Sequence, residues 1–331
     1  MVQRMPISIM RFNHILPGTD PAALASIYQA SLEMASVADE AGFMAVSLEE
    51  HHGVDDGWSP APLTTAGLIL GRTKNLRIMV QALLLPLNDP LRVAEQIAVL
   101  DLASGGRLNV VAGLGYRPEE YADAGIDWKT RGARMDASLA AVVSAWSGEE
   151  FTYEGRTVRV TPTPRTPAAG ILFVGGSGKP AARRAARLGL GLLPAANLPE
   201  LAAYYEEQCA EHGTTPFIIM PPADTTLNLI AEDPDKAWAE LGPHLLHEAR
   251  RYQSWQTADI HSAVSSHAET IEELRAEGIY RILSPEQAID ACTAAGEWST
   301  MVLHPLCGGI PVDRGWDTVN LYVNKVLPAL A

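Results

Sequence analysis

Short runs of strand-type residues alternate with longer amphipathic runs along the whole chain. This alternation is typical of βα units that build a parallel sheet. Eight strands are predicted, at residues 7–12, 45–50, 77–85, 108–114, 171–175, 191–194, 217–221 and 300–304. Because eight parallel strands favour a closed barrel over an open sheet, the pattern predicts an α/β fold, the (β/α)8 TIM barrel.

One domain is expected to span residues 1–331, since (β/α)8 barrels of about 200 to 300 residues or more have a single core. A hairpin at 151–160, turning at Glu154-Gly155, would lie outside the barrel. An insertion at about 231–284, between the seventh and eighth strands, contains a helix rich in histidine and aromatic residues. We expect this insertion to cover the substrate pocket, and the alternative is a packing element that touches no ligand.

The charge of the chain excludes some classes of partner. Lys+Arg 25 against Asp+Glu 39 gives a net charge of −14, which repels nucleic acid and anionic membrane surfaces. The apolar runs are far shorter than the ~20 residues that cross a bilayer, and no basic-then-apolar leader precedes Ile7. Three scattered cysteines indicate neither a disulfide framework nor a clustered metal site. We therefore expect a cytoplasmic protein that binds neither nucleic acid nor membrane.

Two carboxylates and two imidazoles, Glu49-Glu50-His51-His52, end the second predicted strand. Barrel enzymes carry their reactive groups at such strand ends. Because neighbouring residues of an extended chain point to opposite sides, only one of His51 and His52 is expected to face the barrel axis. A paired-histidine metal site is disfavoured, since further ligands have no defined spacing. An imidazole that moves a proton near pH 7 is the favoured role.

Two glycine-rich segments follow predicted strands. The run 112–118 lacks the third glycine of a dinucleotide fingerprint, so its Gly113 and Gly115 indicate only close backbone approach, which suits a flat cofactor and also occurs in ordinary turns. The run 174–180 is not a P-loop, because Phe173 and Pro180 stand where a glycine and a hydroxyl residue are needed. Its amide groups precede a helix and could hold a phosphate, although such a helix entry can also lack any ligand.

His244, His247 and Glu248, with His261 and His267 further on, could be read as a metal cluster. Residues three apart share a helix face, but the ligand pattern is looser than in metal sites of known type. Histidines that lie on the surface or line a pocket explain the same residues better, so no metal site is predicted.

Several short motifs of this chain are more specific than the general features of a barrel. In chain order they closely resemble those of the luciferase-like monooxygenases, and the resemblance covers nearly the whole chain apart from the insertion. The motifs are Glu50-His51-His52, Leu84-Leu85-Pro86, Asp89-Pro90, Ala94-Glu95-Gln96, Leu100-Asp101, 104–108, 113–121, Gly125, Arg131, Trp146, 153–155, 174–177 and 304–309.

The resemblance implies a (β/α)8 barrel, usually a homodimer, that binds reduced flavin mononucleotide (FMN) or the deazaflavin F420 at the carboxyl ends of the strands. It assigns the catalytic imidazole to His51 and a non-prolyl cis peptide, behind the cofactor ring, to Gln81-Ala82. It places the cofactor phosphate near Gly176, Ser177 and Gly178, with Arg131 as a candidate cationic partner.

One departure concerns a Cys-Arg pair that contacts flavin and phosphate in luciferase itself. This chain has Gly113-Leu114 there. We therefore do not expect light emission, and the phosphate would depend on Arg131, Lys179 or backbone amides.

Three functions remain open from the sequence. The first is a two-component flavin monooxygenase, in which a separate flavin reductase supplies reduced FMN and O2 oxidises a small organic substrate. The second is an F420-dependent dehydrogenase or reductase on the same scaffold, although F420 members more often resemble Asp-His at the Glu50-His51 position. The third is a non-catalytic flavin-binding protein.

Overall fold

The computed structural model describes residues 5–255, 264–296 and 299–331. The insertion predicted at 231–284 is therefore only partly described, and His261 lies outside the described residues. None of the described helices combines the length and the apolar character that crossing a membrane requires.

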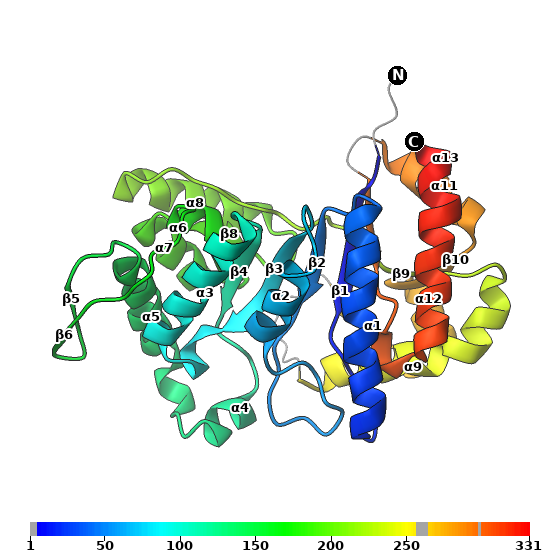
Figure 1. The fold of residues 1–331 in the computed structure, drawn as a ribbon, viewed down its shortest axis with the longest axis horizontal. Helices are drawn as coiled ribbons and strands as arrows, with labels where there is room; N and C mark the ends of the chain where they lie inside the picture. Colours follow the sequence, from blue (N-terminus) through cyan, green and yellow to red (C-terminus); the bar gives the residue numbers. More distant parts are fainter. Residues whose placement is uncertain (1–4, 256–263, 297–298) are drawn as a thin grey trace.

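A parallel sheet forms the centre of the molecule (Figure 1). Within the described residues it has nine strands in the order β10-β9-β11-β1-β2-β3-β4-β7-β8. Their bounds are β1 Ile7–Phe12, β2 Ala45–Leu48, β3 Arg77–Leu84, β4 Leu108–Gly113, β7 Leu172–Gly175, β8 Gly191–Leu193, β9 Leu227–Ile230, β10 Tyr280–Leu283 and β11 Thr300–Leu303. Among the described residues, the strand pairings within this sheet are all parallel, which confirms the predicted α/β class.

Helices connect the strands. Their bounds are α1 Pro21–Glu40, α2 Pro62–Leu70, α3 Pro90–Ser104, α4 Pro118–Asp123, α5 Arg131–Ala145, α6 Ala168–Ile171, α7 Lys179–Leu188, α8 Pro199–His212, α9 Pro234–Trp255, α10 Ile271–Glu277, α11 Pro285–Ala295, α12 Val312–Leu321 and α13 Leu327–Leu330. Many begin with proline, whose missing N–H costs nothing in a first turn. Asp20 caps α1 and Asp89 caps α3 by accepting from backbone amides.

The core lies where these helices pack on the sheet. Its main cluster includes Met10 and Phe12 of β1, Val80 of β3 and Val110 of β4, all fully buried. A second cluster joins β9, β10 and α9 through Leu229, Ile282 and Leu245. Strands that are apolar on both faces are typical of parallel sheets covered by helices.

The seventh predicted strand, 217–221, is wrong as a strand. This run forms one isolated bridge, from Ile218 to Leu192 of β8, and Phe217 is 49% exposed. It ends in Pro221-Pro222, which lack the N–H groups that a sheet needs. Two strands that the pattern did not predict, β9 and β10, join the sheet beside β11, and β10 lies inside the segment assigned to the insertion.

The hairpin predicted at 151–160 is confirmed as β5, Phe151–Tyr153, and β6, Arg156–Val158. Glu154 and Gly155 both have positive φ angles, 48° and 74°, as a tight two-residue turn requires. The hairpin projects beyond α5, away from the sheet (Figure 1).

Candidate functional site

The predicted cis peptide Gln81-Ala82 is confirmed, and it lies near the carboxyl end of β3. The pairing of β3 with β4 shifts by one residue at this point, between Gln81 and Leu83. Glu50, which follows β2, accepts a hydrogen bond from the backbone N–H of Leu84. This bond ties the end of β2, with its His51-His52 pair, to the end of β3.

His51 is 6% exposed and has a partner on each ring nitrogen. Its Nδ1 lies 3.0 Å from Oε1 of Glu120, and its Nε2 lies 3.2 Å from the hydroxyl of Tyr116. Four aromatic rings surround the imidazole, with centroids 4.8–6.4 Å away: Trp58, Tyr116, Tyr252 and Trp255. His51 is therefore held in a largely dry, aromatic environment.

His52 has different surroundings, as the alternation of an extended chain predicted for the pair. Its side chain is 33% exposed and its Nε2 lies 2.9 Å from Oε1 of Glu50. The hydrogen bond to Glu50 raises the pKa of His52, although partial burial opposes this. Glu50 thus pairs with His52, whereas His51 pairs with Glu120.

Glu120, on α4, is the carboxylate that the sequence did not single out. Its Oε1 also accepts from the backbone N–H of His52 at 2.9 Å and from the Arg117 guanidinium at 3.3 Å. Burial acts to raise the pKa of Glu120, but the His51 hydrogen bond and these other contacts hold it below its usual value. The motif 113–121 contains Glu119 and Glu120 side by side, and only the fold shows that Glu120 points inward.

Gly113 and Ala82 lie against each other on neighbouring strands. A Cβ on Gly113 would lie 2.6 Å from the Cβ of Ala82, closer than real Cβ contacts. Glycine at this strand end therefore keeps the backbone of β4 close to the cis segment of β3. Gly115, two residues further, has φ +75° and continues the bend into the Tyr116-Arg117 segment.

The predicted phosphate segment lies between β7 and α7. Gly176 has φ +125°, a conformation that side chains rarely allow, and Gly178 directly precedes α7. The first turn of α7 carries no acidic residue, and the Lys179 ammonium lies 4.8 Å from the Tyr204 ring centroid. Ser177 also has an interaction partner. The helix start thus offers a positive environment for an anion.

Arg131 is the first residue of α5, a helix that precedes β7 in the chain. Its guanidinium lies 3.8 Å from the centroid of the Trp128 ring and donates to the Trp128 carbonyl at 2.9 Å. Helices α5 and α7 are linked by Arg184, which pairs with Asp136. The role of Arg131 toward a phosphate stays a prediction.

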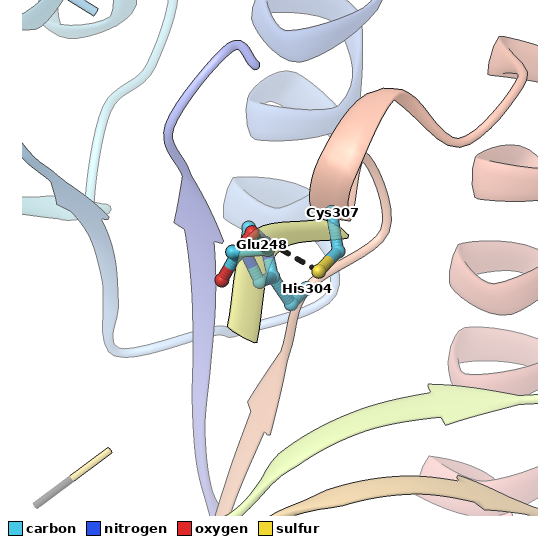
Figure 2. A group of neighbouring side chains, drawn as sticks. All are labelled: Glu248, His304 and Cys307. Carbon is cyan, nitrogen blue, oxygen red and sulfur yellow. Dashed lines mark hydrogen bonds and ion pairs between the residues drawn. The ribbon is translucent and has the colours of Figure 1, made fainter. Parts of the chain in front are cut away.

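A buried charged network adjoins the aromatic residues, and the sequence showed only one of its members, Glu248, with other partners. Glu248 of α9 is completely buried and accepts from Asn13 at 2.6 Å, from His304 at 2.9 Å and from Cys307 at 3.0 Å. Figure 2 shows the convergence of His304 and Cys307 on this carboxylate. Arg11 of β1 bridges Glu248, at 3.2 Å, and Glu49.

His304, Cys307 and Glu248 lie close enough together to suggest a metal site. The hydrogen bonds argue otherwise. Nδ1 of His304 faces the Arg11 carbonyl at 3.0 Å and Nε2 faces the Glu248 carboxylate, so both nitrogens must carry a proton and none is left to bind a metal. Burial also raises the pKa of the Cys307 thiol, which disfavours the thiolate that metals need. The two cations, Arg11 and His304, instead balance Glu49 and Glu248.

The network connects α9 to His51. Tyr252, one turn beyond Glu248, donates to Glu49 at 2.9 Å and accepts from Arg11 at 3.1 Å. Trp255, at the end of α9, stacks on the Arg117 guanidinium at 4.5 Å. One face of α9 therefore provides both the buried carboxylate and two of the rings around the imidazole.

Residues 5–302 match the family of luciferase-like monooxygenases, and the chain belongs to this family. Among curated relatives, the oxygenase component of a flavin-dependent trigonelline monooxygenase from Acinetobacter baylyi is 25% identical over 48% of this chain and 45% of its own length. The chain thus matches less than half the length of the first such relatives, with 44, 40 and 45% covered.

Solved structures match the whole chain. Monooxygenase RslO1 from Streptomyces bottropensis is 26% identical, with a TM-score of 0.73 and 98% of this chain and 99% of that chain covered. The oxygenating constituent of 3,6-diketocamphane monooxygenase from Pseudomonas putida, solved with FMN, has a TM-score of 0.68 at 18% identity, covering 98% of each chain. An F420-dependent secondary alcohol dehydrogenase, 19% identical over 99% of each chain, has a TM-score of 0.65. The fold is therefore that of the luciferase-like TIM barrels.

Proposed function

We propose that this protein is the oxygenase component of a two-component flavin monooxygenase, which uses reduced FMN from a separate flavin reductase, together with O2, to oxidise a small organic substrate. The observation that carries the proposal is the position of His51, a buried imidazole at a strand end of a luciferase-like barrel, enclosed by aromatic rings. The relative from Acinetobacter baylyi, an oxygenase component by name, supports the two-component arrangement.

The residues at this face fit a flavin. Gly113 lets the backbone of β4 approach Ala82 closely, because a Cβ at 113 would lie 2.6 Å from the Cβ of Ala82, and such a side-chain-free strand end suits a flat ring. Gln81, Ala82, Gly113 and Gly115 would line the ring, and the amides of Gly176, Ser177 and Gly178 would hold the phosphate at the start of α7. Bound reduced FMN would supply the electrons that activate O2.

The side chains of the protein would then control protons and water. His51 would accept or donate a proton at Nε2, the nitrogen that lies 3.2 Å from the Tyr116 hydroxyl. The rings of Trp58, Tyr252 and Trp255 would exclude water from the imidazole. A homodimer is expected, as in the resemblance noted above.

The alternative is an F420-dependent dehydrogenase or reductase, which the structural match to an alcohol dehydrogenase of that type keeps open. A non-catalytic flavin-binding protein is the third candidate, and the pairing of His51 with two polar groups argues against an idle imidazole.

Binding titrations of the purified protein with reduced FMN and with F420 test the proposal. We expect tight binding of reduced FMN and its oxidation by O2 on the protein at a rate that candidate substrates change. Tight binding of F420 without binding of FMN would replace the proposal by the dehydrogenase. Binding of FMN with no effect of His51→Asn on its oxidation would favour the non-catalytic protein.

A further inference from the structure

We propose that Glu120 is the positioning residue that fixes the tautomer of His51 and stabilises its protonated form. This inference rests on the proposed function only in assuming that His51 moves a proton. It concerns a carboxylate that lies outside the Glu49-Glu50-His51-His52 segment and reaches it from α4, the helix that follows β4.

The geometry around Glu120 allows a single arrangement of protons. A carboxylate only accepts hydrogen bonds, so the Nδ1 of His51, at 3.0 Å, must donate to Glu120. In the neutral imidazole the proton therefore lies on Nδ1, and Nε2 accepts the hydrogen bond of Tyr116. Burial raises the pKa of Tyr116, which keeps its hydroxyl protonated and able to donate.

Glu120 is itself held in place. Its side chain is fully buried, and the same Oε1 accepts from the backbone N–H of His52 and from Arg117. Oε2 has no hydrogen-bond partner among the described residues. The backbone of the segment that carries His51 thus fixes the Glu120 carboxylate. A fixed carboxylate can orient the imidazole, whereas a mobile carboxylate on the surface could not.

A proton transfer to His51 balances in this arrangement. The substrate or cofactor group loses its proton and keeps the bonding electron pair, the new N–H bond forms at Nε2, and the imidazolium charge lies beside the Glu120 carboxylate. Glu120 keeps its negative charge throughout, as an orienting carboxylate does in an acid–base dyad. On return of the proton, the Nδ1 proton and the tautomer are unchanged.

Several other ionisable groups face the His51 ring, and a test has to separate them from Glu120. Arg117 lies between Glu120 and His52, Tyr116 and Tyr252 lie against the ring, and His52 adjoins it in the chain. Among the described residues, Glu120 is the carboxylate that lies within hydrogen-bond distance of the imidazole.

The experiment follows the His51 ring by 15N NMR of the full-length protein labelled at histidine, with the signal assigned by its loss in His51→Asn. In the parent protein we expect the Nδ1–H tautomer. In Glu120→Gln, which keeps the shape but removes the charge, the midpoint of the ring titration should fall by about one pH unit or more. Glu119→Gln is the matched control, since Glu119 is exposed on the same helix.

The activity arm uses the oxidation of bound reduced FMN. Glu120→Gln should lower the rate by about 10²-fold, with the acid limb of the pH–rate profile moved to lower pH, while Glu120→Asp should restore part of both. An unchanged His51 titration and tautomer in folded Glu120→Gln would overturn the inference. Because the NMR readout needs no flavin, it still tests Glu120 if the protein binds F420 instead of FMN.

Discussion

His51 and His52 are neighbours in the chain, yet their side chains have different hydrogen-bond partners. His51 is enclosed by aromatic rings and hydrogen-bonded to Glu120 and Tyr116, whereas His52 is partly exposed and pairs with Glu50. We expect His51→Ala to lower turnover by ~10²-fold or more with little change in cofactor affinity, because only a buried imidazole at the reaction site acts on protons there. His52→Ala should retain most of the activity. Steady-state kinetics and melting temperatures of both variants provide the measurement.

A structural role for His51 makes a different prediction. If the imidazole only fills the aromatic cluster, His51→Ala should lose thermal stability and activity in proportion, and His51→Phe should restore both. A His51→Ala protein as active as the parent would leave the catalytic assignment without support.

His14 is a buried imidazole that should make the stability of the protein depend on pH in the acid range. Burial, with a smaller contribution from the nearby His304 charge, lowers the pKa of His14 to about 3, and its ring stacks on Tyr28 at 4.2 Å. Because the unfolded chain binds this proton below pH ~6.5 and the folded chain does not, stability should fall from pH 6.5 toward pH 3, by about 2 kcal/mol at pH 5 from this group alone.

The substitution His14→Asn removes this titration. Asparagine tolerates the positive φ of 58° at this position. Urea unfolding at pH 7 and pH 5 should therefore show a smaller loss of free energy of unfolding in His14→Asn than in the parent, even if the variant is less stable at pH 7. Equal losses in the two proteins would mean that His14 is protonated in the folded state.

The residue scale also shows what the sequence could reveal. The motif match predicted the cis bond Gln81-Ala82, which is confirmed, because the bond lies in a short local pattern, whereas the catalytic role of His51 stays a prediction. The roles of Glu120 and Arg11, and the partners of Glu248, were missed, because they depend on which side chains the fold brings together from distant segments. Arg11 and Glu248 are 237 residues apart in the chain, so no local sequence pattern can show that they pair.

At the scale of elements, α9 combines a charged face with an aromatic end. Its Glu248, Tyr252 and Trp255 lie four and three residues apart, so they share one helix face. That face receives Arg11, His304 and Arg117 from the barrel. The helix is therefore held over the site by buried ion pairs as well as by apolar contacts.

Removing the Glu248 charge should destabilise the protein strongly. In Glu248→Gln, Arg11 keeps Glu49 as a partner but His304 loses the carboxylate it pairs with, and an uncompensated buried charge costs about 3–5 kcal/mol. Glu240→Gln, on the same helix, breaks an exposed pair with Arg314 and should cost far less, because solvent screens an exposed ion pair. Free energies of unfolding from urea titrations, with and without a chelator, measure both.

The chelator separates the ion-pair network from a metal site. If His304, Cys307 and Glu248 bound a metal, the chelator would lower the stability of the parent and leave Glu248→Gln unchanged. We expect no effect on either, since the His304 nitrogens are both occupied by protons.

Elements were predicted unevenly, for a physical reason. Strands preceding clear turn or cap signals, such as β1 to β4, were placed within two residues. The strands β9 and β10, each of four residues with a polar one inside, Asn228 and Arg281, were not recognised. The run at Phe217 was apolar enough to imitate a strand, but its exposure, its single bridge to β8 and its prolines distinguish it from one.

At the scale of the whole molecule, the alternation of elements predicted the barrel class. It did not predict β9 and β10, the strands beside β11. The sheet order β10-β9-β11-β1 depends on pairings between the last third of the chain and its first strand. Such contacts are set by packing and burial over the whole fold. The family motifs, spread from Glu50 to Gly309, compensated for this by identifying the scaffold directly.

The surface of the molecule bears on the expected homodimer. Leu68 of α2 and Val99 and Leu102 of α3 are 53%, 51% and 47% exposed, and the two helices pack side by side. Large exposed apolar side chains gathered on adjacent helices are typical of an interface. A net charge of −14 on each protomer opposes association, so a dimer needs such apolar burial and should tighten as salt screens the repulsion.

We therefore expect the parent protein to sediment at about twice 35.6 kDa, more completely at 0.5 M than at 0.02 M salt. The pair of substitutions Leu68→Glu and Val99→Glu should shift it to the monomer, because each buries a charge in the proposed interface and adds to the repulsion. Phe217→Glu is the matched control, since Phe217 is 49% exposed but lies beside β8, on a different part of the sheet. Sedimentation equilibrium separates the outcomes. If the parent protein stays monomeric at micromolar concentration, the expected dimer is wrong. If the dimer persists in the double variant but not in Phe217→Glu, the interface lies on the β8 side of the molecule instead.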